Sequence, residues 1–279
     1  MEKLLITGGS GFLGGRLARH YAPLDPLVPT RAEMDLADPD AVQAYCAAHR
    51  PSRIIHAAAL SDVGYCQNHP AESLVVNVQG TAAVARAAAA VGAKLVVLSS
   101  DQVYMGSTLP GPHSEAAPLT PSNIYGQHKR QAELLALEAC PDAVCLRASW
   151  MYDLPVQGLK NNLGLPGNLV RAALAGRTLA LNEGELRGMT WAQDMVTRMD
   201  DFLRLPGGVY NAGAENNANS LETGRAFARL LGLSEKTVVP ADYPPRCLAM
   251  DCGRLRGLGV EMGTTLESLR RCLTAYGLL

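Results

Sequence analysis

Apolar and polar residues alternate along the first part of the chain in a pattern that predicts strands and helices in turn. Short apolar runs predict buried strands, and stretches with helical spacing of apolar residues predict the helices between them. Strands are expected at residues 3–6, 26–30, 53–59, 94–98 and 143–150. Helices are expected at residues 15–21, from Asp38 onwards, at residues 72–91 and around Tyr125. This alternation predicts an α/β fold with a doubly wound parallel sheet of the Rossmann type.

The pattern is looser in the second half of the chain. Residues 154–168 are rich in Gly, Pro and Asn without clear periodicity, which is typical of a lid over a ligand cleft. Helices are expected at residues 169–175, 194–203, 221–231 and 266–276, and strands at residues 179–181, 208–211 and 247–250. We therefore expect a Rossmann domain over residues 1–152 and a smaller, mixed lobe, mainly for substrate, over residues 153–279.

Composition narrows the classes of partner. The 279 residues are 48% hydrophobic and 18% charged, with a formal net charge of −1, so no nucleic acid or anionic membrane surface is expected as a partner. The seven cysteines are odd in number and include no C-x-x-C pair, which predicts reduced thiols in a cytoplasmic protein and no metal site. We see no signal peptide and no long apolar span, so no membrane helix is expected.

A glycine-rich loop follows the first strand and precedes a helix. Gly8, Gly11 and Gly14 stand three residues apart in this loop, with Phe12 and Leu13 between them. Glycines in this context let the backbone turn tightly and approach a pyrophosphate at the helix N-terminus. An ordinary glycine turn is the alternative interpretation.

The end of the second predicted strand bears on the choice of dinucleotide. A site for NAD usually has an acid there, which holds the ribose 2′-hydroxyl. Here the position carries Arg31, which favours the 2′-phosphate of NADP(H), although NAD(H) remains an option. Arg31 could instead be a solvated loop residue. Asp35 and Leu36 are expected to edge the adenine pocket, and Asp38 is expected to cap a helix.

Small and polar residues end the next predicted strands. Ala57, Ala58 and Ala59 would let a cofactor lie against the backbone, and we interpret His56 before them as a structural histidine. A later strand delivers Ser99, Ser100 and Asp101 to its C-terminal end. In open α/β sheets this end is where ligands bind.

Tyr125 and Lys129 are four residues apart, which places both side chains on one face of a helix. A phenol has a pKa near ~10. A nearby ammonium is expected to lower the pKa of Tyr125, so that the phenol can exchange a proton with a carbonyl oxygen. A surface tyrosine beside a solvated lysine is the alternative.

Taken together, these residues resemble the extended short-chain dehydrogenase/reductase superfamily. The matching pieces are the glycine loop, Ala57 to Ala59, Asn77, Ser99 to Asp101, and Tyr125 with Lys129. Within the superfamily the chain looks most like dTDP-4-dehydrorhamnose reductases. That likeness rests on residues 34–38, 99–104, 121–126 and 146–152, and it is thinner after about residue 150.

The resemblance implies a Ser–Tyr–Lys triad that reduces a 4-keto nucleotide sugar. Ser100 would polarise the substrate carbonyl, Tyr125 would protonate its oxygen, and Lys129 would hold the nicotinamide ribose. Asp101, Gln102 and Trp150 would touch the sugar, although Trp150 could equally be a packing residue. The cofactor site would comprise Gly8, Gly11, Phe12, Leu13, Gly14, Arg31, Asp35, Leu36, Ala57, Ala58, Ala59, Asn77, Ser99, Tyr125 and Lys129. A homodimer is also expected. Because residues 154–168 follow Trp150 and have the composition of a mobile segment, we expect this loop to lie over the substrate cleft and to become ordered when a nucleotide sugar binds.

The chain departs from these reductases at a few positions. The family usually has an aromatic residue in place of Gln102 and an asparagine in place of His56, and its Gly-Ser-Pro-Thr segment corresponds to residues 187–190 here. Two alternatives stay open. One is a nucleotide-sugar epimerase or dehydratase, against which the Asp101–Gln102 pair counts because dehydratases usually have an acidic pair. The other is a non-catalytic NADP-binding subunit, similar to the regulatory subunit of methionine adenosyltransferase.

Overall fold

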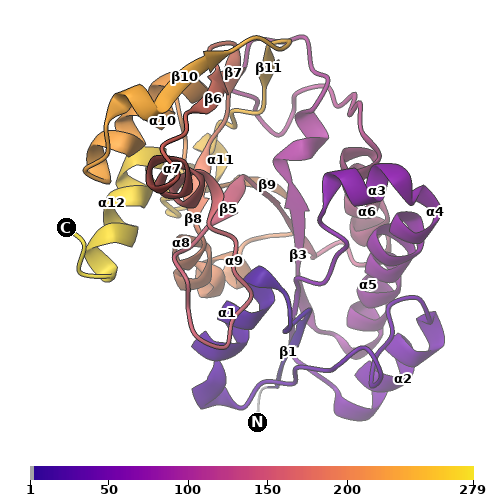
Figure 1. Cartoon of the computed structure of the whole chain (residues 1–279). Coiled ribbons are helices and arrows are strands. Elements are labelled where there is room, and N and C mark those ends of the chain that lie inside the picture. Colours follow the sequence, from indigo (N-terminus) through magenta and orange to yellow (C-terminus); the bar gives the residue numbers. More distant parts are fainter. Residues whose placement is uncertain (1–2) are drawn as a thin grey trace.

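The computed structural model describes residues 3–279 and confirms the predicted parallel α/β fold (Figure 1). A five-stranded sheet forms the centre of the molecule, and all of its neighbouring strands are parallel. Its strand order is β1 (Leu4–Thr7), β2 (Arg53–His56), β3 (Lys94–Ser100), β4 (Val144–Ala148) and β9 (Gly208–Ala212). These strands are mostly buried apolar runs, because helices cover both faces of the sheet.

Two helical layers enclose the sheet (Figure 1). On one face lie α2 (Pro39–His49), α5 (Gly80–Val91) and α6 (Ile124–Ala139), and their buried side chains form one apolar core. On the other face lie α1 (Phe12–His20), α8 (Ala192–Thr197), α9 (Met199–Arg204) and α11 (Gly253–Gly257), which share a second core. As expected, Asp38 caps α2, since its carboxylate accepts hydrogen bonds from the amides of Asp40 and Ala41.

The strand predicted at residues 26–30 is absent. Only Leu27 bridges to Leu5, and its backbone exchanges hydrogen bonds with β1, from Ile6 N to Leu27 O and from Leu27 N to Leu4 O, both at 2.8 Å. Pro26 and Pro29 lack the N–H groups that a longer ladder requires. The chain passes this edge of β1 and then crosses to β2 on the other side. The strand order therefore reverses at β1, which places a ligand crevice at the C-terminal ends of β1 and β2.

The helix predicted at residues 72–91 is divided in the structure. It comprises α4 (Pro70–Ser73), a π-helical turn, η2 (Leu74–Gln79), and then α5. By length and composition, the stretch Pro70–Val91 is the one helix within residues 3–279 that could cross a membrane, and 56% of its most apolar window is buried inside the protein. Its apolar side contacts α2 and α6, so its hydrophobicity is used in the core.

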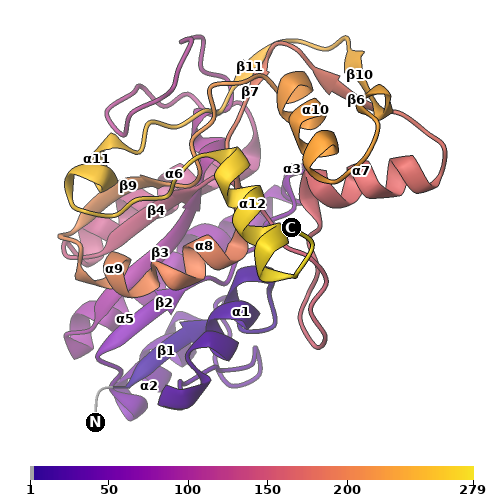
Figure 2. The same ribbon diagram turned by 90° about the vertical axis from the view of Figure 1, so that its left-hand side faces the viewer.

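A smaller lobe covers the C-terminal edge of the sheet (Figure 2). Its core lies between α7 (Gly164–Leu174), α10 (Ser220–Leu230) and α12 (Thr265–Ala275). Three short parallel strand pairs complete it: β5 (Trp150–Tyr152) with β8 (Met189–Trp191), β6 (Leu179–Asn182) with β10 (Val238–Ala241), and β7 (Glu185–Leu186) with β11 (Arg246–Cys247).

Several boundaries in this half differ from the sequence-based prediction. Helix α7 begins at Gly164, within the predicted 154–168 loop, and residues 192–204 form two helices instead of one. The strand predicted at residues 247–250 is the two-residue β11, and β5, β7, β8 and β10 were not predicted as separate strands. The remaining elements are α3 (Val63–Asn68) and the 3-10 turns η1 (Ala22–Leu24), η3 (Asp101–Tyr104) and η4 (Glu235–Thr237).

Candidate active site

One large pocket, of about 1190 Å³, opens where the sheet meets the smaller lobe. It runs from the glycine loop, past the ends of β2 and β3, to Trp150 and Arg187. A pocket for a single drug-sized ligand is typically about 300–1,000 Å³, so this pocket is large enough for a ligand the size of a dinucleotide. Of the predicted site residues, those that line the pocket are Gly8, Gly11, Phe12, Leu13, Arg31, Asp35, Leu36, Ala57, Ala58, Ala59, Ser99, Ser100, Asp101, Gln102, Tyr125, Lys129 and Trp150.

The glycine loop has the geometry of a pyrophosphate cradle. Gly8 has φ +74°, which favours glycine, and a Cβ on Gly14 would lie 2.1 Å from the Gly8 carbonyl oxygen. Gly14 therefore does not line the pocket but allows α1 to approach the loop closely. Helix α1 begins with Gly11 as its N-cap and no side-chain capping bond. Amides of its first turn are thus free to bind an anion, which fits a dinucleotide.

Asn77 was predicted to bind cofactor, and the structure places it behind the pocket wall. It is 1% exposed and lies in the π-helical turn η2. Its side-chain Oδ1 accepts a hydrogen bond from Leu60 N at 2.8 Å, and its Nδ2 donates to Leu60 O at 2.9 Å. Asn77 therefore holds the loop after β2 in place, and this loop carries the three pocket-lining alanines.

His56 at the end of β2 is a buried structural residue, as interpreted from the sequence. Its ring nitrogens hydrogen-bond with Thr7 Oγ1 at 2.8 Å and Thr81 Oγ1 at 3.0 Å. Burial, and secondarily the charge of Lys129, lower the pKa of His56 to about 3. The ring therefore remains neutral and ties β1, β2 and α5 together.

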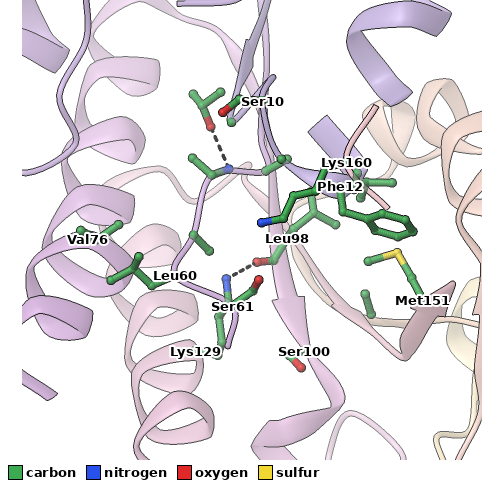
Figure 3. Close-up of a pocket in the computed structure, with 18 of the residues that line it drawn as sticks. Ser10, Phe12, Leu60, Ser61, Val76, Leu98, Ser100, Lys129, Met151 and Lys160 are labelled. Carbon is green, nitrogen blue, oxygen red and sulfur yellow. Dashed lines mark hydrogen bonds between the residues drawn. The ribbon is translucent and has the colours of Figure 1, made fainter. Parts of the chain in front are cut away.

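Ser100, Tyr125 and Lys129 converge on the middle of the pocket. Ser100 is the last residue of β3, and the other two lie one turn apart on α6. The Lys129 ammonium lies 5.7 Å from the centroid of the Tyr125 ring. It donates a hydrogen bond to Leu98 O at 2.8 Å (Figure 3). Gly126 permits this placement of α6, because a Cβ there would lie 2.2 Å from the Gln102 carbonyl oxygen.

The electrostatics of this trio correct one expectation. Burial, reinforced by the Asp101 carboxylate, raises the pKa of Tyr125 above its ordinary value, whereas a hydrogen bond with Ser100 and the charge of Arg187 oppose the rise. Burial also lowers the pKa of Lys129 to about 8, against the opposing effect of Glu133. The expectation of a lowered Tyr125 pKa is thus wrong for this structure, because desolvation of the phenol is the largest influence on that pKa and raises it. A neutral phenol suits the role of proton donor.

Sequence reasoning missed Arg187 as a site residue and noted it only as part of a departure from the family. Its guanidinium pairs with both oxygens of Asp101, from Nε to Oδ2 at 2.9 Å and from Nη2 to Oδ1 at 3.2 Å. It also lies 5.3 Å from the centroid of the Trp150 ring. The Asp101 side chain is 1% exposed, and a buried carboxylate requires a partner. The need of a buried Asp101 for a cationic partner was the sequence feature that could have indicated Arg187, but the two residues are 86 positions apart in the chain.

Gln102 connects the mouth of the pocket to the helix that carries Tyr125. Its Oε1 accepts a hydrogen bond from Asn123 Nδ2 at 3.0 Å, and Asn123 caps α6 through a bond from Gly126 N at 2.7 Å. The side chain is therefore anchored on one side while it lines the pocket on the other.

At the end of the pocket that is predicted to hold the adenosine, Arg31 pairs with Asp35, from Nε to Oδ2 at 3.2 Å. The two side chains are 77% and 38% exposed, so the pair is weak and its partners are accessible. The Asp35 carboxylate also accepts a hydrogen bond from Ala37 N. The choice between the two dinucleotides stays a prediction.

The lid predicted at residues 154–168 is partly helical and partly a loop held by hydrogen bonds. Residues 164–168 belong to α7, and Lys160, Asn161 and Asn162 line the pocket. Asp153 N donates to Asn162 O at 2.9 Å, and Arg16 on α1 donates to Lys160 O at 3.0 Å. The loop thus lies beside α1, next to the part of the pocket that the glycine loop lines. Within residues 3–279 no group of three His, Cys, Asp or Glu side chains could hold a metal ion.

Comparison with known proteins places the chain in a family. Residues 1–248 match the family described as RmlD substrate binding domain. A dTDP-4-dehydrorhamnose reductase of Streptomyces griseus is 30% identical over 92% of this chain and 88% of its own length. The crystal structure of a dTDP-4-dehydrorhamnose reductase from Bacillus anthracis in complex with NADP has a TM-score of 0.86 at 24% identity, covering 98% of this chain and 99% of its own.

A UDP-glucose 4-epimerase of Thermotoga maritima with bound UDP-glucose has the same fold, with a TM-score of 0.77 at 19% identity, covering 98% of this chain and all (100%) of its own. Structural likeness alone therefore does not separate reductases from epimerases. The sequence match over most of the chain is the more specific finding, and by it this chain belongs to the RmlD substrate binding domain family, within the extended short-chain dehydrogenase/reductase superfamily.

Proposed function

We propose that this NAD(P)-dependent oxidoreductase reduces the 4-keto group of a nucleotide sugar and uses Ser100, Tyr125 and Lys129 for the chemistry. The observation that supports the proposal is the convergence of these three side chains in one pocket with the glycine loop. The family match and the reductase relative from Streptomyces griseus give the substrate class.

The roles of the three residues follow from their surroundings. Hydride is the species that a reduced nicotinamide supplies when it is bound. The Ser100 hydroxyl donates a hydrogen bond to the substrate carbonyl oxygen and polarises it. Tyr125, which its raised pKa keeps neutral, releases its proton to that oxygen as negative charge develops there. Lys129 donates to Leu98 O and retains further N–H groups for ribose hydroxyls.

Arg187 organises the other wall of the pocket. By pairing with Asp101 it offsets a carboxylate charge that would raise the pKa of Tyr125 further. Its guanidinium also lies against Trp150, so the substrate is bounded by a cation and an aromatic ring. The cation favours an oxygen-rich, partly anionic ligand such as a nucleotide sugar, and the aromatic ring offers an apolar face on which a sugar ring can pack.

Three further assignments are part of the proposal. NADP(H) is the preferred dinucleotide, because the exposed Arg31 can exchange Asp35 for a 2′-phosphate. A cytoplasmic location and a homodimeric state are carried over from the sequence and the resemblance.

The test is a turnover screen. We expect purified protein to oxidise NADPH in the presence of at least one dTDP-4-keto-6-deoxyhexose, and Tyr125→Phe to lose this activity. An epimerase would convert sugar without net NADPH oxidation. A regulatory subunit would bind the dinucleotide and turn over none of the sugars, and either outcome would overturn the reductase assignment.

A further inference from the structure

The loop between β5 and α7 brings a lysine to the cofactor half of the pocket. Two lysines line this pocket, Lys129 and Lys160. In Figure 3, Lys160 extends from beside Phe12 across the pocket, on the side away from Ser100. Lys129 has an assigned role, whereas nothing in the proposed chemistry uses Lys160.

The backbone of Lys160 is held against the helix that follows the glycine loop. Arg16 Nη1 donates to Lys160 O at 3.0 Å and to Phe12 O, in the first turn of α1, at 2.8 Å. The same guanidinium is paired with Asp153, and these two side chains are only 3% and 5% exposed. Asp153 is itself held by Trp191 Nε1 at 2.7 Å and Tyr276 OH at 3.0 Å. The loop is therefore fastened to α1 by a buried network.

The ammonium of Lys160 is left available for an anionic ligand. The three acidic residues that line the pocket have other partners: Asp101 pairs with Arg187, Asp35 with Arg31, and Glu72 accepts a hydrogen bond from Tyr65. Within residues 3–279, no acidic side chain forms an ion pair with Lys160. An unpaired cation and the uncapped N-terminus of α1 thus face the same space, and both favour negative charge.

We propose that Lys160 binds the pyrophosphate of the nicotinamide dinucleotide, on the side opposite the glycine loop. The inference rests on the proposed dinucleotide site and adds a ligand from the C-terminal half of the chain. The pyrophosphate is the favoured group because Lys160 is anchored at Phe12, the first residue of α1, where such a group binds. The 2′-phosphate would lie instead near Arg31, at the far end of the pocket. The loop then contacts the bound cofactor through the Lys160 ammonium, while its backbone stays held against α1.

The experiment measures dissociation constants for NADPH and NADH with Lys160→Met, which keeps the length of the side chain and removes its charge. A charge-assisted contact predicts that both cofactors bind roughly tenfold or more weakly, because both contain the pyrophosphate. Lys160→Arg should retain most of the affinity. Lys236→Met, on the 3-10 turn η4 away from the pocket, is the matched control and should bind both cofactors like the parent protein.

Adenosine 2′-monophosphate lacks the pyrophosphate and should bind the parent and Lys160→Met equally. Unchanged affinities for both dinucleotides would overturn the proposal. A loss confined to NADPH would also overturn it, because the contact would then be to the 2′-phosphate. No sugar is present in these measurements, so failure of the proposed reductase activity would leave their outcome unaffected.

Discussion

The ion pair between Arg187 and Asp101 gives the sharpest stability prediction. Replacing Arg187 with Gln leaves a carboxylate that is 1% exposed without its bidentate partner. Breaking a buried pair from one side costs about 3–5 kcal/mol. The Arg187 side chain is 16% exposed, which lets some water reach the site, so we expect the lower end, about 3 kcal/mol. In urea unfolding this corresponds to a midpoint lower by about 1 M.

Two comparisons isolate the pair. Asp101→Asn combined with Arg187→Gln removes both charges, and the double variant should be more stable than Arg187→Gln alone. Arg229→Gln breaks the pair with Glu235, whose side chains are 59% and 43% exposed, and should cost less than about 1 kcal/mol. The reasoning would be refuted if Arg187→Gln lost less free energy of unfolding than Arg229→Gln. It would also be refuted if the double variant were no more stable than Arg187→Gln alone.

The other predictions concern the site and the buried histidine. Tyr125→Phe should lower kcat by roughly 10² or more with little change in cofactor Kd, since only the proton donor is lost. Lys129→Ala should lower kcat and also weaken cofactor binding. Full activity of Tyr125→Phe would show that Tyr125 and Lys129 are not the catalytic pair. Arg31→Ala should narrow the preference for NADPH over NADH. Equal dissociation constants for NADPH and NADH in the parent protein would contradict the assignment of Arg31 to the 2′-phosphate. His56 has its pKa lowered to about 3 from 6.5, so the unfolded state binds more protons between these values and stability falls as pH drops through this window. Between pH 6.5 and 4.5 the parent should therefore lose about 2 kcal/mol more than His56→Asn in urea unfolding, and parallel losses would show that His56 is not the cause.

Local patterns allowed much of the Rossmann half to be predicted. The glycine loop, the buried strands and the spacing of Tyr125 and Lys129 are short-range features, and the structure places them around one pocket. A strand was predicted at residues 26–30 from the apolar residues there. Only a single bridge forms, because the prolines lack the N–H groups that a strand ladder needs.

What the sequence could not supply depends on contacts between distant segments. The raised pKa of Tyr125 results from burial under several elements, which no spacing of two residues reveals. Asn77 was predicted from its motif to bind the cofactor, but its side-chain amide is hydrogen-bonded to the backbone of Leu60. The partnership of Arg187 with Asp101 joins the small lobe to the end of β3, and no local periodicity indicates it.

The transfer of isotope from cofactor to sugar tests the central proposal most directly. NADPH that carries deuterium at the transferred position of the nicotinamide is incubated with the protein and a dTDP-4-keto-6-deoxyhexose, and the product is analysed by NMR and mass spectrometry. We predict one deuterium at C4 of the product alcohol for each NADPH oxidised. A sugar product without deuterium and without net oxidation of NADPH would contradict reduction by this chain.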